Sequence, residues 1–188
     1  MSNITRKMIL GGYLSYGTGH HAASWRHPLT PSDVAVSISH YIKLSEIAES
    51  AFFDFMFLSD TPSVFSDEQE GYGSRVAVFE HLKLLSAIAM KTSNLGLIAT
   101  SSTTYKEPYN TAREFASLDL ISNGRSGWNL VTSSKANAAF NFGFESHPDH
   151  EDRYARAEEF FDVVTGLWDS WDDDALLRET TTGKFYEP

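Results

Sequence analysis

The chain alternates short apolar runs with polar clusters and helix-like patterns, four times over. The apolar runs have the length of buried strands and lie at residues 8–14, 52–58, 94–100 and 127–131. Each leads through a polar cluster into a segment with apolar residues every three or four positions. These segments predict helices at about residues 30–49, 80–91, 108–120 and 151–168. The alternation therefore predicts four βα units.

Capping residues mark the ends of the predicted helices. Thr30-Pro31-Ser32-Asp33 has the N-cap residue, the first-turn proline and the acid that begin a helix. Ser122-Asn123-Gly124 closes the third helix. Residues 132–148 are predicted as a long loop, and residues 171–188 have no strong period. No linker or repeat divides the pattern, so residues 1–188 are predicted to form one unit without an internal boundary.

Two architectures fit four βα units in a row. Consecutive parallel strands require right-handed crossovers, which occur both in a doubly wound sheet and in a TIM (β/α)8 barrel. A barrel needs about 250 residues and rarely has fewer than 200. Within 188 residues, four units would therefore make half a barrel.

Composition excludes several classes of protein. The chain is 41% hydrophobic, has no cysteine and carries a formal net charge of −10. The hydrophobic fraction is sufficient for a buried core, and the absence of cysteine excludes disulfides and thiolate-bound metals. The acidic balance argues against nucleic acid or an anionic membrane as a partner. No apolar run approaches the roughly 18 residues of a membrane span, and the N-terminus is unlike a signal peptide, so we expect a cytoplasmic protein.

Polar side chains follow the predicted strands at the ends where ligands bind in both architectures. They are His20 and His21, Ser59 and Asp60, residues 100–104, and residues 129–133. Separate solvated loops would also be polar. The density of hydroxyls, amides and one carboxylate nevertheless favours a shared pocket.

The common catalytic motifs are absent. The sequence contains no dinucleotide or phosphate loop of the G-x-G-x-x-G or Walker type, no H-E-x-x-H and no G-x-S-x-G. His147, Asp149, His150 and Asp152 are metal ligands by type. Acids at a helix N-terminus suit the helix dipole, however, and we favour that interpretation over a metal site.

His150 and Tyr154 lie four residues apart at the start of the last helix and so share one face. A helix N-terminus with donors beside it suits a phosphate group. Tyr154 could equally be a core aromatic residue, and spacing alone leaves both interpretations open.

Seven blocks of residues, in order, carry a resemblance to a known family. They are Trp25-Arg-His-Pro28; Phe57-Leu-Ser-Asp60; Thr100-Ser-Ser-Thr-Thr-Tyr105 with Pro108-Tyr109 and Ala112-Arg113; Ser122-Asn-Gly-Arg125; Trp128-Asn-Leu-Val-Thr-Ser133; Asn141-Phe-Gly143; and His150-Glu-Asp-Arg-Tyr154. From about residue 8 onward, the chain resembles the nitrilotriacetate, dibenzothiophene-sulfone and long-chain alkane monooxygenase branch of the bacterial-luciferase-like flavin monooxygenases.

The resemblance implies a TIM (β/α)8 barrel of the luciferase-like type, of which about the first half is present. It implies a two-component monooxygenase that uses FMN in its reduced form, FMNH2. A separate NAD(P)H:flavin reductase supplies that flavin, and one oxygen atom from O2 enters a small organic substrate. Self-association into a homo-oligomer is also expected by analogy.

The resemblance also implies roles for individual residues. Asp60 and Thr100 match positions at the flavin ring, and His150 and Tyr154 match its phosphate end. Asn129 and Ser133 fall in a motif beside the flavin. His20 and His21 lie in the loop that helps to wall the substrate pocket, and they are the catalytic candidates. Their alternative role is that of a loop packing residue plus an exposed histidine.

Two departures from the family pattern leave other interpretations open. The chain ends at Pro188, where relatives continue through the rest of the barrel, so it is either a fragment or it assembles with another chain. Glu80-His81-Leu82-Lys83 stands where relatives have a proline-containing helix start. The alternatives are a non-catalytic, flavin-binding or dimerising remnant of such an enzyme, and an unrelated doubly wound hydrolase.

Overall fold

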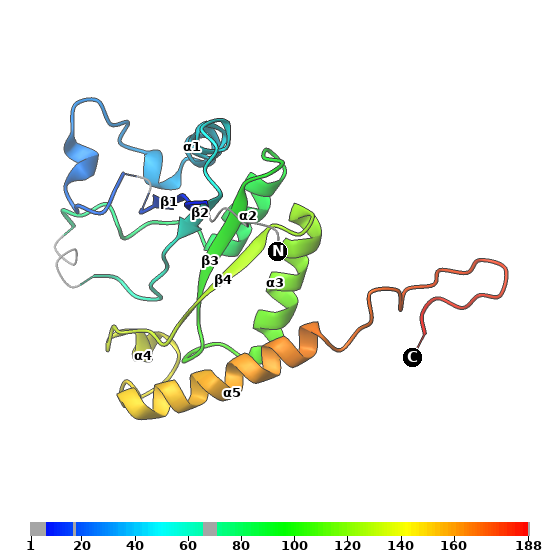
Figure 1. The fold of residues 1–188 in the computed structure, drawn as a ribbon. Helices are drawn as coiled ribbons and strands as arrows, with labels where there is room; N and C mark the ends of the chain where they lie inside the picture. Colours follow the sequence, from blue (N-terminus) through cyan, green and yellow to red (C-terminus); the bar gives the residue numbers. More distant parts are fainter. Residues whose placement is uncertain (1–6, 17, 66–70, 188) are drawn as a thin grey trace.

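A parallel four-stranded sheet lies at the centre of the molecule (Figure 1). The computed structural model describes residues 7–16, 18–65 and 71–187. The strands are β1 (Gly11–Leu14), β2 (Phe55–Leu58), β3 (Gly96–Ser102) and β4 (Ser126–Val131). Each strand pairs in parallel with the next one along the chain. The predicted βα alternation is confirmed, with the first three strands beginning two or three residues later than the apolar runs.

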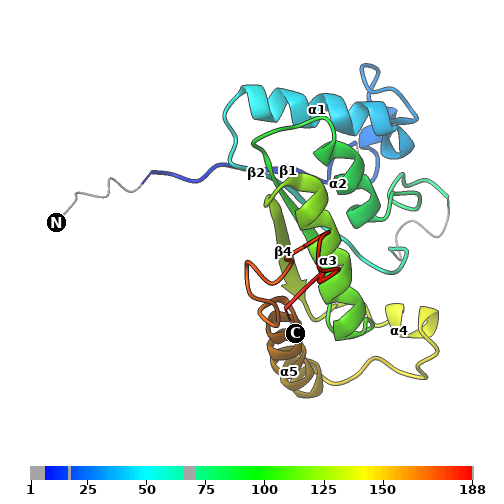
Figure 2. The same cartoon turned by 90° about the vertical axis from the view of Figure 1, so that its right-hand side faces the viewer.

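The strand order distinguishes the two candidate architectures. A doubly wound sheet reverses its order at a switch point, whereas the order here runs β1-β2-β3-β4 without reversal. Right-handed crossovers in one direction place all helices on the same face of the sheet. The helices are α1 (Ile38–Ser50), α2 (His81–Ala89), α3 (Pro108–Ser122) and α5 (His150–Trp168). They form one outer layer beside the sheet (Figures 1 and 2), as in half of a (β/α)8 barrel.

The two faces of the sheet have different environments. Leu97 and Ala99 on β3 are fully buried against apolar side chains of α2 and α3. Alternate residues point the other way, toward what is the interior of a closed barrel. On that inner face the rings of Tyr13 and Phe57 stack with centroids 5.3 Å apart, yet Tyr13 remains 50% exposed. The inner face of the half-barrel is therefore partly open.

Two local predictions are wrong. The helix predicted from Thr30 begins at Ile38, with Ser37 as its N-cap, and a 3₁₀ turn, η2 (Val34–Val36), precedes it. Val34 and Ala35 of that turn are buried under α1, where the Tyr41 hydroxyl donates to the Ala35 carbonyl at 3.3 Å. A second 3₁₀ turn, η1 (Ser24–Arg26), lies in the loop after β1.

The long loop predicted after β4 contains a short helix, α4 (Ala138–Asn141). Four residues are too few to show a helical period, which is why the sequence pattern missed it. Ala138 and Ala139 are fully buried and anchor this segment.

Several predicted helix ends are confirmed. Glu80 caps α2 by accepting from the Lys83 amide at 3.0 Å, so this helix is capped without a proline. Asn123 and Gly124 adopt left-handed conformations after α3, with φ of 60° and 81°. Among the helices of the described segments, none is long and apolar enough to cross a membrane.

Two charged residues, Glu49 and Arg125, fix the turn between α2 and β3 through hydrogen bonds. One carboxylate oxygen of Glu49 accepts from the amides of Ser93, Asn94 and Leu95 at 2.8, 2.6 and 3.0 Å. The Arg125 guanidinium donates to carbonyls on the same turn, including Thr92 and Leu95 at 2.9 and 2.7 Å. Burial raises the pKa of Glu49, but the three amides and the charge of Arg125 outweigh it and lower the pKa below 4.5.

We expect Glu49→Gln to lower the free energy of unfolding by about 1 kcal/mol at pH 7. Because the folded-state pKa of Glu49 is depressed, its stabilising effect is present above the unfolded pKa. That effect is lost as the pH falls through the folded pKa. Urea unfolding between pH 7 and pH 3 should show the variant and the parent converging at low pH. Glu46→Gln, on the exposed side of α1, is the control, and a difference that persists at pH 3 contradicts the assignment.

Candidate functional site

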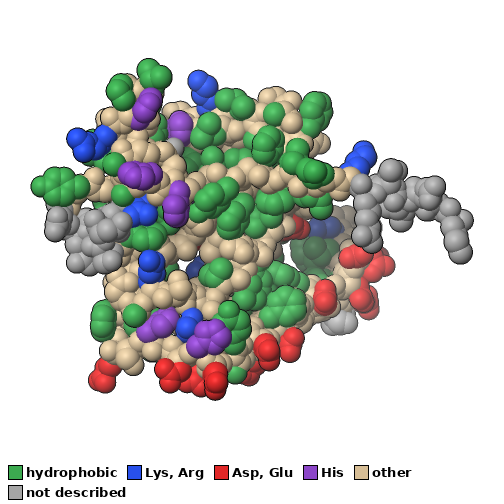
Figure 3. Space-filling model, turned by 60° about the vertical axis from the view of Figure 1, so that its left-hand side comes forward, with side chains coloured by type: hydrophobic (Ala, Val, Ile, Leu, Met, Phe, Trp, Pro, Cys, Tyr) green, Lys and Arg blue, Asp and Glu red, His purple; other side chains and the backbone are tan. Residues whose placement is uncertain are grey.

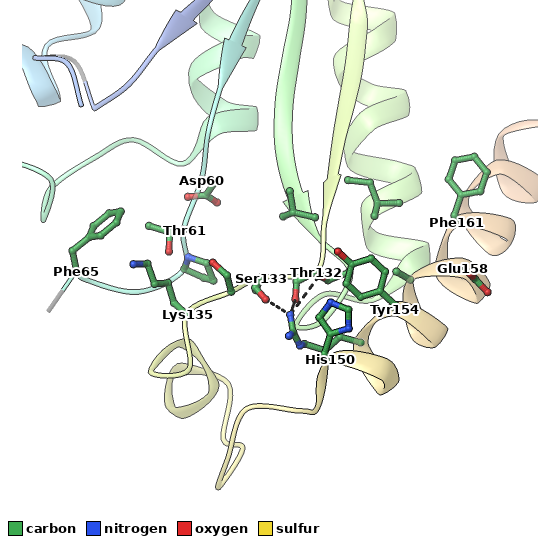
Figure 4. Close-up of a pocket in the computed structure, with 16 residues that line it drawn as sticks. Asp60, Thr61, Phe65, Thr132, Ser133, Lys135, His150, Tyr154, Glu158 and Phe161 are labelled. Atoms are coloured by element: carbon green, nitrogen blue, oxygen red, sulfur yellow. Dashed lines mark hydrogen bonds between the residues drawn. The ribbon is translucent and has the colours of Figure 1, made fainter. Parts of the chain in front are cut away.

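A cavity of about 800 Å³ lies at the carboxyl ends of β2 and β4 and along the first half of α5 (Figure 4). Its volume is within the range of small-molecule sites. The predicted residues that line it are Asp60, Ser133, His150 and Tyr154. The structure thus brings together half of the sequence-predicted site residues, from a strand end, a loop and a helix start.

One end of the cavity suits an anion. The rings of His150 and Tyr154 stack with centroids 4.4 Å apart, so the two residues do share one face of α5. Tyr154 is 52% exposed, which excludes a buried core role for it in this structure. The side chain of the N-cap residue, Asp149, makes no capping hydrogen bond. The first amides of α5 and the positive end of its dipole therefore remain available to a ligand.

Arg153 also lines the cavity, next to the His150–Tyr154 pair. Its guanidinium donates to the carbonyls of Thr132 and Pro148, each at 3.0 Å, and to that of Ser133. Ser133 has a left-handed backbone with φ of 53°, and its hydroxyl donates to Ser102 at 2.7 Å. Arg153 was assigned no role from the sequence, although it lies inside the His150–Tyr154 block.

Thr100 and Asn129 lie on the inner face of the sheet, outside the lining of this cavity. The Asn129 side-chain amide donates to the Thr100 hydroxyl at 2.9 Å, and that hydroxyl donates to the Leu58 carbonyl at 2.7 Å. This chain of hydrogen bonds links β4, β3 and β2 just below the cavity. Their contact with a flavin stays a prediction.

His20 and His21 do not line the cavity either. His20 lies 3.5 Å from the Ser15 hydroxyl through Nδ1, and His21 accepts from the Ala23 amide at 3.1 Å. Both are exposed in the loop after β1. Their catalytic role also stays a prediction.

An aromatic cluster supports the loop that leads into α5. The Tyr105 hydroxyl lies 2.5 Å from Nδ1 of His147, and its ring stacks on Phe142 with centroids 4.6 Å apart. Burial and the charge of Arg153 lower the pKa of His147, although a backbone hydrogen bond to Ser133 opposes them. A neutral His147 ring can accept a hydrogen bond from the Tyr105 hydroxyl, and this bond holds the loop in place.

Two asparagines form hydrogen bonds between segments that border the cavity. Asn137 donates to the Val64 carbonyl at 3.0 Å, and Asn141 donates to the Pro62 carbonyl at 2.7 Å. These bonds join the loop after β2 to the segment around α4. Phe65 and Lys135, which sequence reasoning did not single out, line the cavity beside this junction.

The cavity combines features that a flat ring and a phosphate group require. Apolar side chains of Leu130, Ala157 and Phe161 line part of it, and polar groups converge near α5. The uncapped start of α5 with its exposed His150–Tyr154 pair offers donors to a phosphate. The residues present therefore fit FMN.

The chain is similar in sequence to curated monooxygenases. Over its whole length the chain is 49% identical to N-acetyl-S-(2-succino)cysteine monooxygenase of Bacillus subtilis, covering 42% of that protein. It is 43% identical to nitrilotriacetate monooxygenase component A of Aminobacter aminovorans, with 93% of this chain and 40% of that protein covered. The chain spans about two fifths of the length of these curated relatives.

A solved structure shows the same fold. The crystal structure of a riboflavin lyase with modified FMN and riboflavin superposes with a TM-score of 0.87 at 32% identity, covering 97% of this chain and 42% of that one. The expected resemblance and the half-barrel are confirmed by these relatives. Residues 15–188 match the luciferase-like monooxygenases, and the chain belongs to that family.

Proposed function

We propose that this chain forms the flavin-binding half of a two-component monooxygenase. One oxygen atom of O2 enters a small organic substrate, the other leaves as water, and reduced FMN supplies two electrons. A separate NAD(P)H:flavin reductase provides the reduced flavin, and the reaction takes place in the cytoplasm. The observation that carries the proposal is the cavity where Asp60, Ser133, His150 and Tyr154 meet.

The names of two relatives support the cofactor and the partner. The nitrilotriacetate enzyme is named as component A, which implies at least one further component. The riboflavin lyase was crystallised with a modified FMN. We extend both features to this protein.

Different residues of the chain bind different parts of the flavin. His150, Tyr154 and the first amides of α5 bind its phosphate, and Asp60 lies at the ring end. Thr100 and Asn129 hold the strand ends below the ring through their hydrogen bonds. Apolar side chains such as Leu130 and Phe161 exclude water from the reacting atoms.

The alternative is a non-catalytic, flavin-binding or dimerising remnant. In either case the partly open inner face, with Tyr13 half exposed, is a surface that another half-barrel would cover. Self-association is one way to cover it. Turnover of an organic substrate with a reductase, FMN and NADH separates the two functions, because with a remnant the reductant is consumed and peroxide is released without any substrate being oxygenated.

Anaerobic titration with FMN and FMNH2, with circular dichroism on the same sample, tests the proposal directly. Saturable binding that is tighter for the reduced flavin supports it. A folded chain that binds neither form contradicts it.

Tyr154→Phe should weaken FMN binding about tenfold, since a hydrogen bond to a charged group contributes about 1.5 kcal/mol. Riboflavin, which lacks the phosphate, should lose no affinity. Tyr109→Phe is the matched control, because this tyrosine is 62% exposed on α3. An equal loss for FMN and riboflavin would place the Tyr154 hydroxyl elsewhere than at the phosphate.

A further inference from the structure

Four side chains from separate segments form an aromatic–cation cluster, and two of them, Phe65 and Lys135, line the cavity. The four are Tyr16 after β1, Phe65 after β2, Arg75 before α2, and Lys135 after β4. The Arg75 guanidinium lies 4.2 Å and the Lys135 ammonium 4.7 Å from the centroid of the Phe65 ring. Tyr16 meets the same ring edge-on at 5.7 Å.

The cluster is built into the structure. Arg75 is only 9% exposed, and it donates to the His20 carbonyl at 3.5 Å. The bonds of Asn137 and Asn141 to the loop after β2 fix the segment that carries Lys135 against the segment that carries Phe65. Lys135 is itself exposed and lines the cavity.

Arg75 and Lys135 lie close together in a chain whose net charge is negative. The formal net charge is −10, and Figure 3 shows acidic side chains gathered along the lower rim of the molecule. At the cluster, two positive charges lie at most about 9 Å apart because they share one ring. Asp60 and Glu158 also line the cavity, but no carboxylate of the described residues forms an ion pair with Lys135. Lys135 is thus able to bind an anion that enters the cavity.

We propose that Lys135 binds a carboxylate of the organic substrate, so that the enzyme acts on small organic acids. This inference rests on the proposed function. Figure 4 shows Phe65 and Lys135 on the side of the β2 loop, with Ser133 between them and the His150–Tyr154 pair. The two ends of the cavity can therefore take two different anionic groups, the flavin phosphate and a substrate carboxylate.

Calorimetric titration of the chain with succinate, in the absence of flavin, tests the inference. We expect succinate to bind and its uncharged dimethyl ester to bind at least about tenfold more weakly, since charged hydrogen bonds contribute most of the contact. Lys135→Met should weaken succinate binding by about tenfold, and Lys135→Arg should retain most of it. Lys91→Met, an equal loss of charge at an exposed position after α2, should leave succinate affinity unchanged.

Several results overturn the inference. These are no binding of succinate, equal binding of the ester, and an unchanged affinity in Lys135→Met. Lys135→Gln serves as a second variant if the methionine variant loses its circular dichroism spectrum.

Titration of the same variants with FMN and riboflavin shows whether Lys135 binds the flavin phosphate or the substrate carboxylate. If Lys135→Met lowers the affinity for FMN but not for riboflavin and leaves succinate binding intact, the lysine binds the flavin phosphate and the inference fails. A parent chain that binds no flavin would instead contradict the proposed function. The succinate titration does not require flavin, so the two failures can be told apart.

Discussion

Arg125→Met should lower the free energy of unfolding by about 3 kcal/mol, the largest effect on stability that we expect from one substitution. The guanidinium donates to four carbonyls, those of Ala89, Thr92, Leu95 and Ser122, at 2.6 to 3.0 Å. Methionine fills a similar volume but leaves these acceptors without a partner. It also removes the positive charge that acts on Glu49.

Urea unfolding followed by circular dichroism measures this loss. Arg113→Met is the matched control, because Arg113 is exposed on α3, near Arg125 in the chain. We expect its effect to stay within about 0.5 kcal/mol, as for most surface substitutions. Equal losses in the two variants would mean that the carbonyl contacts of Arg125 contribute little.

Arg153→Met should weaken FMN binding by about 2 kcal/mol, or about thirtyfold in dissociation constant. Arg153 does not need to touch the flavin for this result. It fixes the carbonyls of Thr132, Ser133 and Pro148, and so holds the Ser133 loop beside the start of α5. Without it, the left-handed backbone at Ser133 loses its support, and the cavity loses its shape.

Arg156→Met separates this effect from a general loss of stability. Arg156 lies one turn further along α5 and also donates to carbonyls, those of Thr103 and Lys106 at 2.9 and 3.0 Å. Its loss should lower the melting temperature by a similar amount but leave FMN affinity nearly intact. If both variants lose FMN binding equally, Arg153 acts only through the stability of α5.

The architecture was predictable because apolar periodicity depends on burial, and burial is what separates strands from helices here. Leu97 and Ala99 are buried because β3 lies under α2 and α3, and this gives the strand its continuous apolar run. The start of the first helix was not predictable from Thr30-Pro31. Packing of Val34 and Ala35 under Tyr41 favours a 3₁₀ turn there, which is a tertiary effect that no capping pattern records.

The candidate site was predictable where residues lie at strand ends or on one helix face. Asp60 and the His150–Tyr154 pair follow from these rules, and the cavity contains all three. Lys135 and Phe65 lie in loops without periodicity, and tertiary contacts such as the hydrogen bonds of Asn137 and Asn141 bring them to the cavity. His20 and His21 lie several residues beyond the end of β1, and a loop of that length is not held at the sheet edge, so a position after a strand does not predict that they line the cavity.

The consecutive strand order has a consequence for how the chain reaches its fold. Each strand pairs with the strand made just before it, and paired residues such as Gly11 and Phe55 lie fewer than 50 positions apart. A chain that leaves the ribosome from its N-terminus can therefore add one βα unit at a time to a sheet that already exists. Along the three paired edges of this sheet each strand therefore meets its partner early, which shortens the time that those edges are exposed to other chains.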